Sequence, residues 1–410
     1  MMKKVVADSN IELAAKRVKR NKGAPGIDGM KVDELDGWLR EQWPRVRGEL
    51  LAGTYEPKPV RRVMIPKRGG GERMLGIPTV VDRLLQQALL LELQPQLDPS
   101  FSEYSYGFRP GRSAHDAVGQ MRDFVAEGRC WVVDIDLEKF FDRVNHDMLM
   151  GRLAKRIGDR DVLRLIRRYL NAGVMADGVK VVRGDGTPQG GPLSPLLANV
   201  YLDEVDKKLE RRGHAFVRYA DDLRVLVYSK RAGERVMRRR VKDFEKLKLR
   251  VNESKSTVAR VYERPFLGFS LREDDEKGPR IQASSKALKT MKTRVREITR
   301  KNRGRAVEQV VRELGYDLRG WWGYFRYMED LRELRKCMTW VRRRVRCLIL
   351  YQYKTPHRAY RALRALGASD SQARTVAAHI ERHWWVSTGR INRILTNSYL
   401  ARLGVPTLVT

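Results

Sequence analysis

Two adjacent aspartates, Asp221 and Asp222, lie between two short apolar segments whose residues alternate as in β-strands. This pattern predicts a β-hairpin with both carboxylates at its turn. A third carboxylate, Asp136, follows another apolar and β-branched segment. Asp134 lies two residues earlier on the same face of that strand, so the pattern alone does not separate these two residues. Aspartates in a turn often serve only local hydrogen bonds, but carboxylates at the ends of two strands also suit a Mg²⁺ site.

Carboxylates held together at strand ends can support phosphoryl transfer. Two Mg²⁺ ions about 4 Å apart can bind the attacking and the leaving oxygens of such a reaction. Mg²⁺ uses few carboxylates and completes its coordination with substrate phosphates and water, which fits three aspartates and a nucleotide. The charge of the chain indicates the same class of substrate. With 83 Lys and Arg against 50 Asp and Glu, the 410 residues carry a net charge of +33, and such a chain attracts nucleic acid.

The composition excludes several other classes of protein. Hydrophobic residues make up 42% of the chain, which is enough to build cores and excludes wholesale disorder. No uncharged apolar run approaches the roughly 18 residues of a membrane-spanning helix, and a charge comes too early at the N-terminus for a signal peptide. The three cysteines, Cys130, Cys337 and Cys347, form no C-x-x-C pair, so neither a disulfide framework nor a cysteine zinc site is expected. We therefore expect a cytoplasmic protein without a membrane segment.

Strand-like and helical patterns are mixed along roughly the first two thirds of the chain. A helix is predicted over 195–211, where apolar residues recur every three or four positions. This mixture indicates an α+β sheet layer covered by helices on one face. A charged, turn-rich stretch at 273–279 and a second break near 366–370 are natural boundaries. Between them the chain is predominantly basic, as expected of a surface that binds a phosphate backbone.

The residues around the acidic pair carry a family resemblance. Tyr219-Ala220-Asp221-Asp222 resembles the catalytic box of reverse transcriptases, and nearly the whole chain resembles bacterial group II intron reverse transcriptases, the intron-encoded maturases, in their short class C-like form without an endonuclease domain. The matching blocks follow in family order: NKGAPGIDG at 21–29, IPK at 65–67 with RMLGIPT at 73–79, YGFRPGRS at 106–113, DLEKFFD at 136–142, GTPQGGPLSP at 186–195 and FLGF at 266–269. The resemblance implies an α+β right-hand polymerase, with fingers and palm at 1–275, an all-α thumb or maturase domain at 284–366 and a small C-terminal DNA-binding region at 367–410.

The resemblance also assigns the catalytic centre. The catalytic aspartate of the family precedes an aromatic residue by five positions, which selects Asp136 over Asp134. Asp136, Asp221 and Asp222 are then the catalytic residues and the ligands of two Mg²⁺ ions, with Mn²⁺ as a substitute. Phe141 is the aromatic residue; it is expected to pack beneath the sugar and exclude a 2′-hydroxyl, although a core position is the alternative.

Further residues are expected to form the nucleotide pocket. Lys67 and Arg73 flank a glycine-rich loop, which is either a solvated basic turn or, as the resemblance implies, a finger that closes over the triphosphate. Arginine supplies bidentate phosphate contacts and lysine a point charge. The resemblance adds Gln189 as a contact to sugar and template, Ala220 of the catalytic box, and Lys255 near the active site.

Two groups of arginines are expected to contact nucleic acid. Arg109 and Arg112 belong to the YGFRPGRS block, and the others accompany large aromatic residues in the basic C-terminal third: Arg319, Arg326, Arg342, Arg343, Arg344 and Arg346. The alternative is a helical bundle with an aromatic core and a solvated cationic face. Because no single helical face holds the last four, we expect at least one to pair with an acid such as Glu329 or Glu333.

The resemblance implies an RNA-directed DNA polymerase of the bacterial cytosol or nucleoid. It would be encoded by a group II intron, act as a maturase that binds intron RNA for splicing, and copy that RNA into DNA during retrohoming. Its partners would be intron RNA, an RNA template with a DNA primer, target DNA and deoxynucleoside triphosphates (dNTPs), with the protein a monomer or weak dimer. Two alternatives stay open: a domesticated relative in DNA repair or defence, and a splicing-only RNA-binding maturase, against which the intact aspartates argue.

Overall fold

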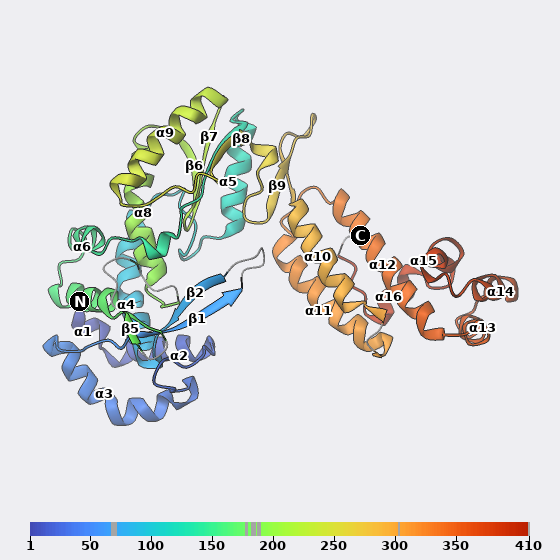
Figure 1. Ribbon diagram of the computed structural model, residues 1–410, viewed down its shortest axis with the longest axis horizontal. Helices are drawn as coiled ribbons and strands as arrows, with labels where there is room; N and C mark the ends of the chain where they lie inside the picture. The colour runs from blue at the N-terminus through green and yellow to red at the C-terminus, as the bar shows by residue number, and fades with distance from the viewer. Residues whose placement is uncertain (67–71, 177–178, 182–185, 187–189, 302–303, 409–410) are drawn as a thin grey trace. The chain divides into compact units, whose positions relative to one another are not determined.

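The computed structural model describes the chain except for residues 67–71, 177–178, 182–185, 187–189, 302–303 and 409–410, and leaves undescribed the side chains of 73, 174, 176, 179–181 and 390. The described residues form two compact units, Met1–Val261 and Tyr262–Thr410 (Figure 1). Strands and helices are mixed in the first unit, and helices dominate the second. The predicted α+β fold with a helical C-terminal region is thereby confirmed. The three predicted domain limits stay a prediction.

The first part of unit 1 is a group of helices around a four-stranded sheet. The sheet has the order β2-β1-β4-β5, with β1 and β2 antiparallel. The elements are α1 (Met2–Val5), α2 (Asp8–Arg20), η1 (Val32–Glu34), α3 (Leu35–Ala52), β1 (Val60–Pro66), β2 (Glu72–Ile77), α4 (Val80–Leu97), η2 (Asp98–Ser100), α7 (Arg160–Asn171), β4 (Val174–Ala176) and β5 (Val179–Val181).

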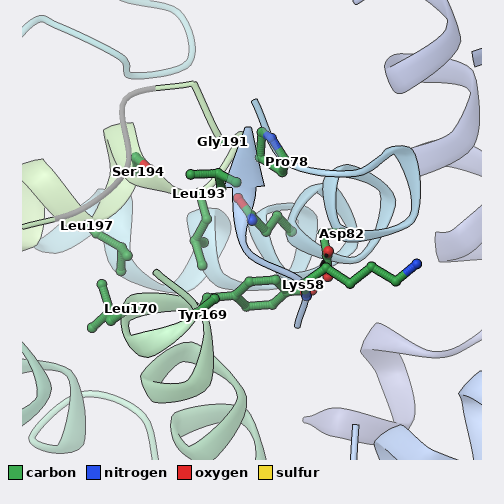
Figure 2. A pocket seen from close by; sticks show the side chains of 12 residues that line it. Lys58, Pro78, Asp82, Tyr169, Leu170, Gly191, Leu193, Ser194 and Leu197 are labelled. Atoms are coloured by element: carbon green, nitrogen blue, oxygen red, sulfur yellow. Dashed lines mark hydrogen bonds between the residues drawn. The ribbon is translucent and has the colours of Figure 1, made fainter. Parts of the chain in front are cut away.

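A buried carboxylate joins these helices to the start of β1. Asp82, which is 1% exposed, accepts hydrogen bonds from the Tyr55 hydroxyl at 2.8 Å, the Tyr169 hydroxyl at 3.3 Å and the Lys58 backbone N–H at 3.2 Å. Thr79 caps α4 and donates its hydroxyl to the same carboxylate. Burial raises the pKa of Asp82. Figure 2 shows Tyr169 directed toward Asp82 beside a cavity of about 20 Å³, the size of one water molecule, so this cluster is structural.

The rest of unit 1 is built on an antiparallel sheet of order β6-β7-β3-β8. Helix α9 lies along it (Figure 1). Val133 and Ile135 of β3 and Leu223 and Val225 of β7 belong to the main apolar core. Because side chains alternate along a strand, Asp134 and the even-numbered residues of β7 lie on the opposite face. The elements are α5 (Ala114–Ala126), β3 (Trp131–Ile135), η3 (Phe140–Asp142), α6 (His146–Ala154), α8 (Ser194–Glu210), β6 (Ala215–Tyr219), β7 (Asp222–Val227), α9 (Lys230–Lys246) and β8 (Thr257–Arg260). The short helix η4 (Val261–Glu263) begins at the last residue of unit 1 and continues into unit 2.

Unit 2 combines a short hairpin with helices. The aromatic side chains expected in its core gather around Phe269, whose ring centroid lies 5.1 Å from that of Phe325 and 5.4 Å from that of Tyr324. Within the described residues, no helix combines the length and apolar character needed to cross a membrane. The elements are β9 (Phe269–Arg272), β10 (Arg280–Ala283), α10 (Ser285–Ile298), α11 (Val307–Phe325), α12 (Arg332–Tyr353), α13 (Pro356–Ala365), α14 (Asp370–Ala378), α15 (His383–Val386), η6 (Gly389–Arg393) and α16 (Asn397–Leu403).

The contact between α9 and the sheet depends on a glycine. A Cβ added at Gly233 would lie 2.5 Å from Val258 Cγ1 and 3.4 Å from Val227 Cγ2. We expect Gly233→Ala to lower the free energy of unfolding by about 1–3 kcal/mol, because the helix must move away from the sheet. The measurement is the midpoint of urea unfolding followed by circular dichroism.

The matched control is Gly48→Ala in α3, where an added Cβ has no neighbour within 4 Å. Here the gain in helix propensity should raise the free energy of unfolding by about 0.5–1 kcal/mol. Equal stabilisation by both substitutions would show that α9 does not pack on the sheet through this glycine.

Candidate active site

The structure brings the three predicted aspartates to one end of the β6-β7-β3-β8 sheet. Ile135 of β3 pairs with Leu223 of β7, so the next residues along the two strands, Asp136 and Asp222, follow on directly in the same register. Tyr219 pairs with Asp222 and closes the β6–β7 hairpin, which places Asp221 in its two-residue turn. The predicted hairpin is confirmed, and the register brings Asp136 to the same sheet end as the other two aspartates, although it lies far from them in sequence.

Exposure separates Asp136 from Asp134. The Asp134 side chain is 6% exposed and lies 3.1 Å from Arg224 Nε, whereas the Asp136 side chain is 42% exposed. Asp222 is 39% exposed and lies 3.3 Å from the same Arg224 nitrogen. Burial raises the pKa of Asp222 to about 6; the nearby charges of Asp134 and Asp221 add to the rise and Arg224 opposes it. Asp136 and Asp222 can therefore reach a ligand, while Asp134 is held in a buried ion pair.

A loop before β8 fixes the backbone of Asp136. The Asp136 N–H donates to Ser256 Oγ at 3.0 Å, and its carbonyl accepts from the Asn252 N–H at 2.8 Å. The same loop carries Lys255, whose Nζ lies 3.5 Å from Asp136 Oδ2 and whose side chain is 67% exposed. Lys255 is thus next to a predicted catalytic carboxylate, where its charge can also meet a phosphate.

A buried network supports the turn from below. The Arg218 guanidinium is 2% exposed and bonds to Asp206 on α8, with Nη2 at 2.5 Å and Nε at 2.9 Å from its carboxylate oxygens. Arg218 Nη1 also donates to the carbonyl of Ala220 at 2.8 Å and to Asn199 Oδ1 at 3.0 Å. These residues were not predicted from the sequence. An arginine within an apolar strand could have indicated such a network, because a buried charge needs a partner.

The predicted YGFRPGRS block lies against the same turn. Asn199 Nδ2 donates to the Gly107 carbonyl at 2.9 Å, and the Tyr106 N–H donates to the Arg218 carbonyl at 2.8 Å. A Cβ added at Gly107 would lie 2.3 Å from the Ala220 backbone nitrogen. Only glycine allows this approach, and Ala220 itself has a φ of +57°, in the left-handed region that costs other residues roughly 1 kcal/mol or more. The turn is therefore held from two sides.

Phe141 lies next to the first glycine of the GTPQGGPLSP block. It is half-buried in η3, with its ring centroid 5.1 Å from that of Phe140. The backbone of Gly186 lies against the Phe141 carbonyl, since an added Cβ would be 3.1 Å from that oxygen, and Gly186 donates its N–H to the Val144 carbonyl at 2.8 Å. On the far side of the segment, a Cβ at Gly190 would lie 2.5 Å from the carbonyl oxygen of Gly76 in β2.

Three predicted nucleotide contacts fall wholly or partly outside the described residues. Lys67 and Gln189 lie outside them entirely. Arg73 is described only through its backbone, which pairs with Ile65 across the β1–β2 hairpin. Their assignment to the nucleotide pocket stays a prediction.

Arg109, expected to contact nucleic acid, has a structural position in the protein. Its guanidinium is 4% exposed, and all five N–H groups have acceptors. Nε and Nη2 donate to the Asp98 carboxylate, Nη2 also donates to the Asp98 carbonyl, and Nη1 donates to the carbonyls of Ser102 and Ser105. A guanidinium with five N–H groups has no further donor for a phosphate. Arg112 is half-exposed and donates to the Glu103 carbonyl.

The arginines of α12 also make internal contacts. Arg346 is 6% exposed and donates from Nε to the Leu395 carbonyl at 2.8 Å and from Nη2 to Asn397 Oδ1 at 2.9 Å. Arg344 donates to Thr299 Oγ1 at 2.7 Å. These acceptors are neutral oxygens, so neither of these two residues supplies the expected pairing with an acid.

The remaining predicted arginines of unit 2 differ in exposure. Arg343 is half-buried and donates to Ser387 Oγ and to the Trp384 carbonyl. Arg342 is half-buried, and Arg319 and Arg326 are exposed. The two acids suggested as partners are used elsewhere: Glu329 accepts from the Ile281 N–H at 2.9 Å, and Glu333 pairs with Lys336 at 2.7 Å. The exposed pair on α11 and its C-terminal end therefore remains the better candidate for phosphate contact.

Comparison with known proteins identifies the family. Residues 65–271 match the family described as reverse transcriptase (RNA-dependent DNA polymerase), and residues 288–367 match the group II intron maturase-specific domain. The chain belongs to the reverse transcriptase family. Its two matched regions give it the reverse transcriptase and maturase functions of the group II intron type, and they imply RNA and other nucleic acid as its substrates. The predicted family and function are confirmed at this level.

Similar proteins support the same family. Protein YkfC of Escherichia coli K12 is 34% identical over 300 residues, which cover 63% of this chain and 79% of YkfC. The group II intron-encoded protein LtrA of Lactococcus lactis subsp. cremoris is 40% identical over 197 residues, which cover 48% of this chain but 32% of LtrA. A solved structure, the partial Cas6-RT-Cas1–Cas2 complex, is 26% identical with a TM-score of 0.39 and covers 60% of this chain and 42% of that one, a likeness too low to argue from.

The contact of Gly107 with the catalytic turn can be tested in this reverse transcriptase. We expect Gly107→Ala to reduce single-nucleotide primer extension about 100-fold, because the new Cβ displaces the backbone that carries Asp221, and small displacements of reacting groups have effects of this size. Binding of RNA should persist. The measurement is single-turnover extension with saturating primer and template.

Gly151→Ala in α6 serves as the control, because an added Cβ there has no neighbour within 4 Å. The control should extend primers at the rate of the unmodified protein. An equally active Gly107→Ala protein would show that the turn does not depend on this contact.

Proposed function

We propose that this reverse transcriptase is encoded by a group II intron, synthesises DNA on an RNA template from a DNA primer, and uses Asp136, Asp221 and Asp222 as catalytic residues. The observation that carries the proposal is the placement of these three aspartates at the same end of one sheet, with Asp136 and Asp222 both accessible. Asp134, the alternative within the same strand, is engaged with a buried arginine.

The donor set fits Mg²⁺, and the carboxylates would bind it together with the substrate. Among the described residues, no three His, Cys, Asp or Glu side chains are grouped closely enough to hold a metal by themselves. Mg²⁺ does not need such a cage, because it commonly uses one or two carboxylates with substrate phosphates and water. In the structure, the negative charge of Asp136 is compensated by Lys255 and that of Asp222 by Arg224. We propose that Mg²⁺, or Mn²⁺ in its place, binds there with Asp221 as the third ligand.

The reaction joins the primer to the incoming dNTP. The primer 3′-oxygen forms a bond to the α-phosphorus, the bond from that phosphorus to the bridging oxygen breaks, and pyrophosphate leaves. Two bound Mg²⁺ ions would supply charge stabilisation for the attacking and leaving oxygens. The chain itself holds the carboxylates in place through the Arg218 network, presents the Lys255 ammonium at the same edge, and, as the resemblance implies, directs Lys67 and Arg73 to the triphosphate.

We further propose that unit 2 binds the intron RNA for splicing and that the copied intron enters target DNA by retrohoming. Its match to the maturase-specific domain and the exposed Arg319 and Arg326 support this role. We propose a monomer or weak dimer in the bacterial cytoplasm. The intact catalytic carboxylates favour this proposal over a splicing-only maturase. The DNA around the gene would distinguish a domesticated protein in repair or defence. In that case the gene would not lie within a sequence that encodes a group II intron RNA.

The catalytic role of Asp136 is tested against its neighbour. We expect Asp136→Asn to abolish primer extension and to leave RNA binding intact, because it removes a metal-binding charge without disturbing the core. The matched variant Asp134→Asn should lower the free energy of unfolding, because Arg224 loses a buried partner, but should retain extension. Extension and RNA binding are measured on the same preparations, and the stability of each variant by urea unfolding.

The reverse pattern, an active Asp136→Asn and a folded but inactive Asp134→Asn, would assign the catalytic carboxylate to position 134.

The sugar selectivity of Phe141 is a separate prediction. Phe141→Val should admit ribonucleotides, because the lost bulk opens space for a 2′-hydroxyl. We expect the ratio of deoxynucleotide to ribonucleotide incorporation to fall by about 10-fold or more. Discrimination of this size is typical of a pocket that excludes one additional group of a substrate. Both nucleotides are compared on one template. An unchanged ratio in a folded, active protein would restrict Phe141 to packing against Phe140.

A further inference from the structure

A second cationic site lies in unit 1, away from the aspartates. A pocket of about 360 Å³ is lined by the start of β6, the end of β7, one side of α9 and Arg129, which lies two residues before β3. The β6–β7 hairpin has its turn at the aspartates and its open end at this pocket, and the strand lengths separate the two by about 15 Å at the usual rise per residue. The site is therefore distinct from the catalytic one.

Positively charged groups predominate among the polar residues that line this pocket. The lining includes five arginines and one histidine, and no acidic side chain: Arg129, Arg212, His214, Arg235, Arg239 and Arg240. Arg129 pairs with Glu127. For Arg212, Arg235 and Arg239, the described part of the chain offers no acidic side chain as a hydrogen-bond or ion-pair partner, and all three are exposed. Such a group of uncompensated guanidinium groups favours an anion.

The floor of the pocket holds a buried arginine with unused donors. The Arg240 side chain is 1% exposed, and its Nη2 forms an ion pair with Asp243 at 2.8 Å. Its Nε and Nη1 find no hydrogen-bond partner among the described residues. Buried donors without partners cost free energy, which an anion in the pocket would recover. Burial lowers the pKa of Arg240, with Arg212 and Arg239 acting in the same direction against Asp243, and burial together with Arg240 and Arg212 lowers the pKa of His214.

We propose that this pocket binds the phosphate backbone of a single strand of nucleic acid. Two features favour a strand over a free phosphate. The cations continue along α9 beyond the pocket, at spacings of three and four residues that define one helical face: Arg231, Arg235, Arg239, Lys242 and Lys246. This line extends over about four turns of helix, which is long enough for several phosphates.

An aromatic residue at the rim is the second feature. Tyr228 is 64% exposed, and the Arg129 guanidinium lies 5.0 Å from its ring centroid. Exposed aromatics beside cationic grooves stack on bases in proteins that bind single strands. The pocket thus offers a cationic floor for phosphate and an aromatic rim for a base. This inference does not depend on the assignment of the catalytic aspartates.

The test uses the full chain with its primer–template site already saturated by an RNA template and DNA primer. Binding of a labelled 20-nucleotide single-stranded RNA is then titrated at several salt concentrations. The triple variant Arg212→Gln/Arg235→Gln/Arg239→Gln should bind at least about 10-fold more weakly. Its slope of log affinity against log salt should fall by about two, because each lost contact to a single strand removes about 0.7. Primer extension should be unchanged.

The matched control removes three exposed arginines and lysines of unit 1 that do not line the pocket: Arg47→Gln, Lys155→Gln and Arg160→Gln. It has the same net charge as the pocket variant and should keep the slope of the unmodified protein. Tyr228→Ala should weaken RNA binding without changing the slope, because it removes a base contact and no phosphate contact. Circular dichroism checks that all variants are folded.

Two results would overturn the proposal. Equal losses in the pocket variant and the control would show that only net charge matters. Binding of inorganic phosphate, followed by ³¹P NMR at constant ionic strength, could instead be lost in the pocket variant while its RNA slope is unchanged. That result would make the pocket a site for small anions.

Discussion

The buried ion pair between Arg218 and Asp206 is the interaction on which the proposed catalytic end of unit 1 depends. A guanidinium and a carboxylate that are both almost fully buried need each other, because removing either leaves an uncompensated charge in the core. The same guanidinium binds the Ala220 carbonyl and Asn199, and Asn199 binds Gly107. Helix α8, the glycine block and the hairpin turn are thus joined at one side chain. The left-handed backbone at Ala220 persists because these contacts over-determine it.

A second ion pair, on the other face of the same sheet, distinguishes Asp134 from the carboxylates proposed to be catalytic. Asp134 and Asp136 share that face, yet Asp134 is buried and paired with Arg224, while Asp136 follows the end of the strand and is exposed. Asp222 shares features of both residues, since it contacts Arg224 as Asp134 does and is partly exposed as Asp136 is. Burial is the main cause of its raised pKa, and the charges of Asp134 and Asp221 add to the rise. Neighbouring carboxylates of this kind favour binding of a cation.

Local patterns made part of this structure predictable. The hairpin at the acidic pair and helix α8 follow from alternation and from helical periodicity, which are properties of neighbouring residues. Only the family resemblance could predict that Asp136 and Lys255 lie near each other, since they are more than a hundred residues apart in the sequence. The partners of Arg218, Arg109 and Arg346 could not be predicted, because a guanidinium can donate to acids, carbonyls or phosphates, and only the fold decides which acceptor lies within reach.

In a chain with a net charge of +33, the number of arginines says little about which of them bind nucleic acid. What distinguishes them is how many of the five guanidinium N–H groups already have acceptors. All five N–H groups of Arg109 donate to acceptors inside the protein, so this side chain stabilises a loop. Arg240 is buried as deeply but leaves Nε and Nη1 without partners and faces a hollow lined by other cations. Two arginines of similar burial therefore have different roles. An arginine whose N–H groups all have acceptors stabilises the fold. An arginine with N–H groups that lack acceptors, in a cationic pocket, indicates a binding site for an anion.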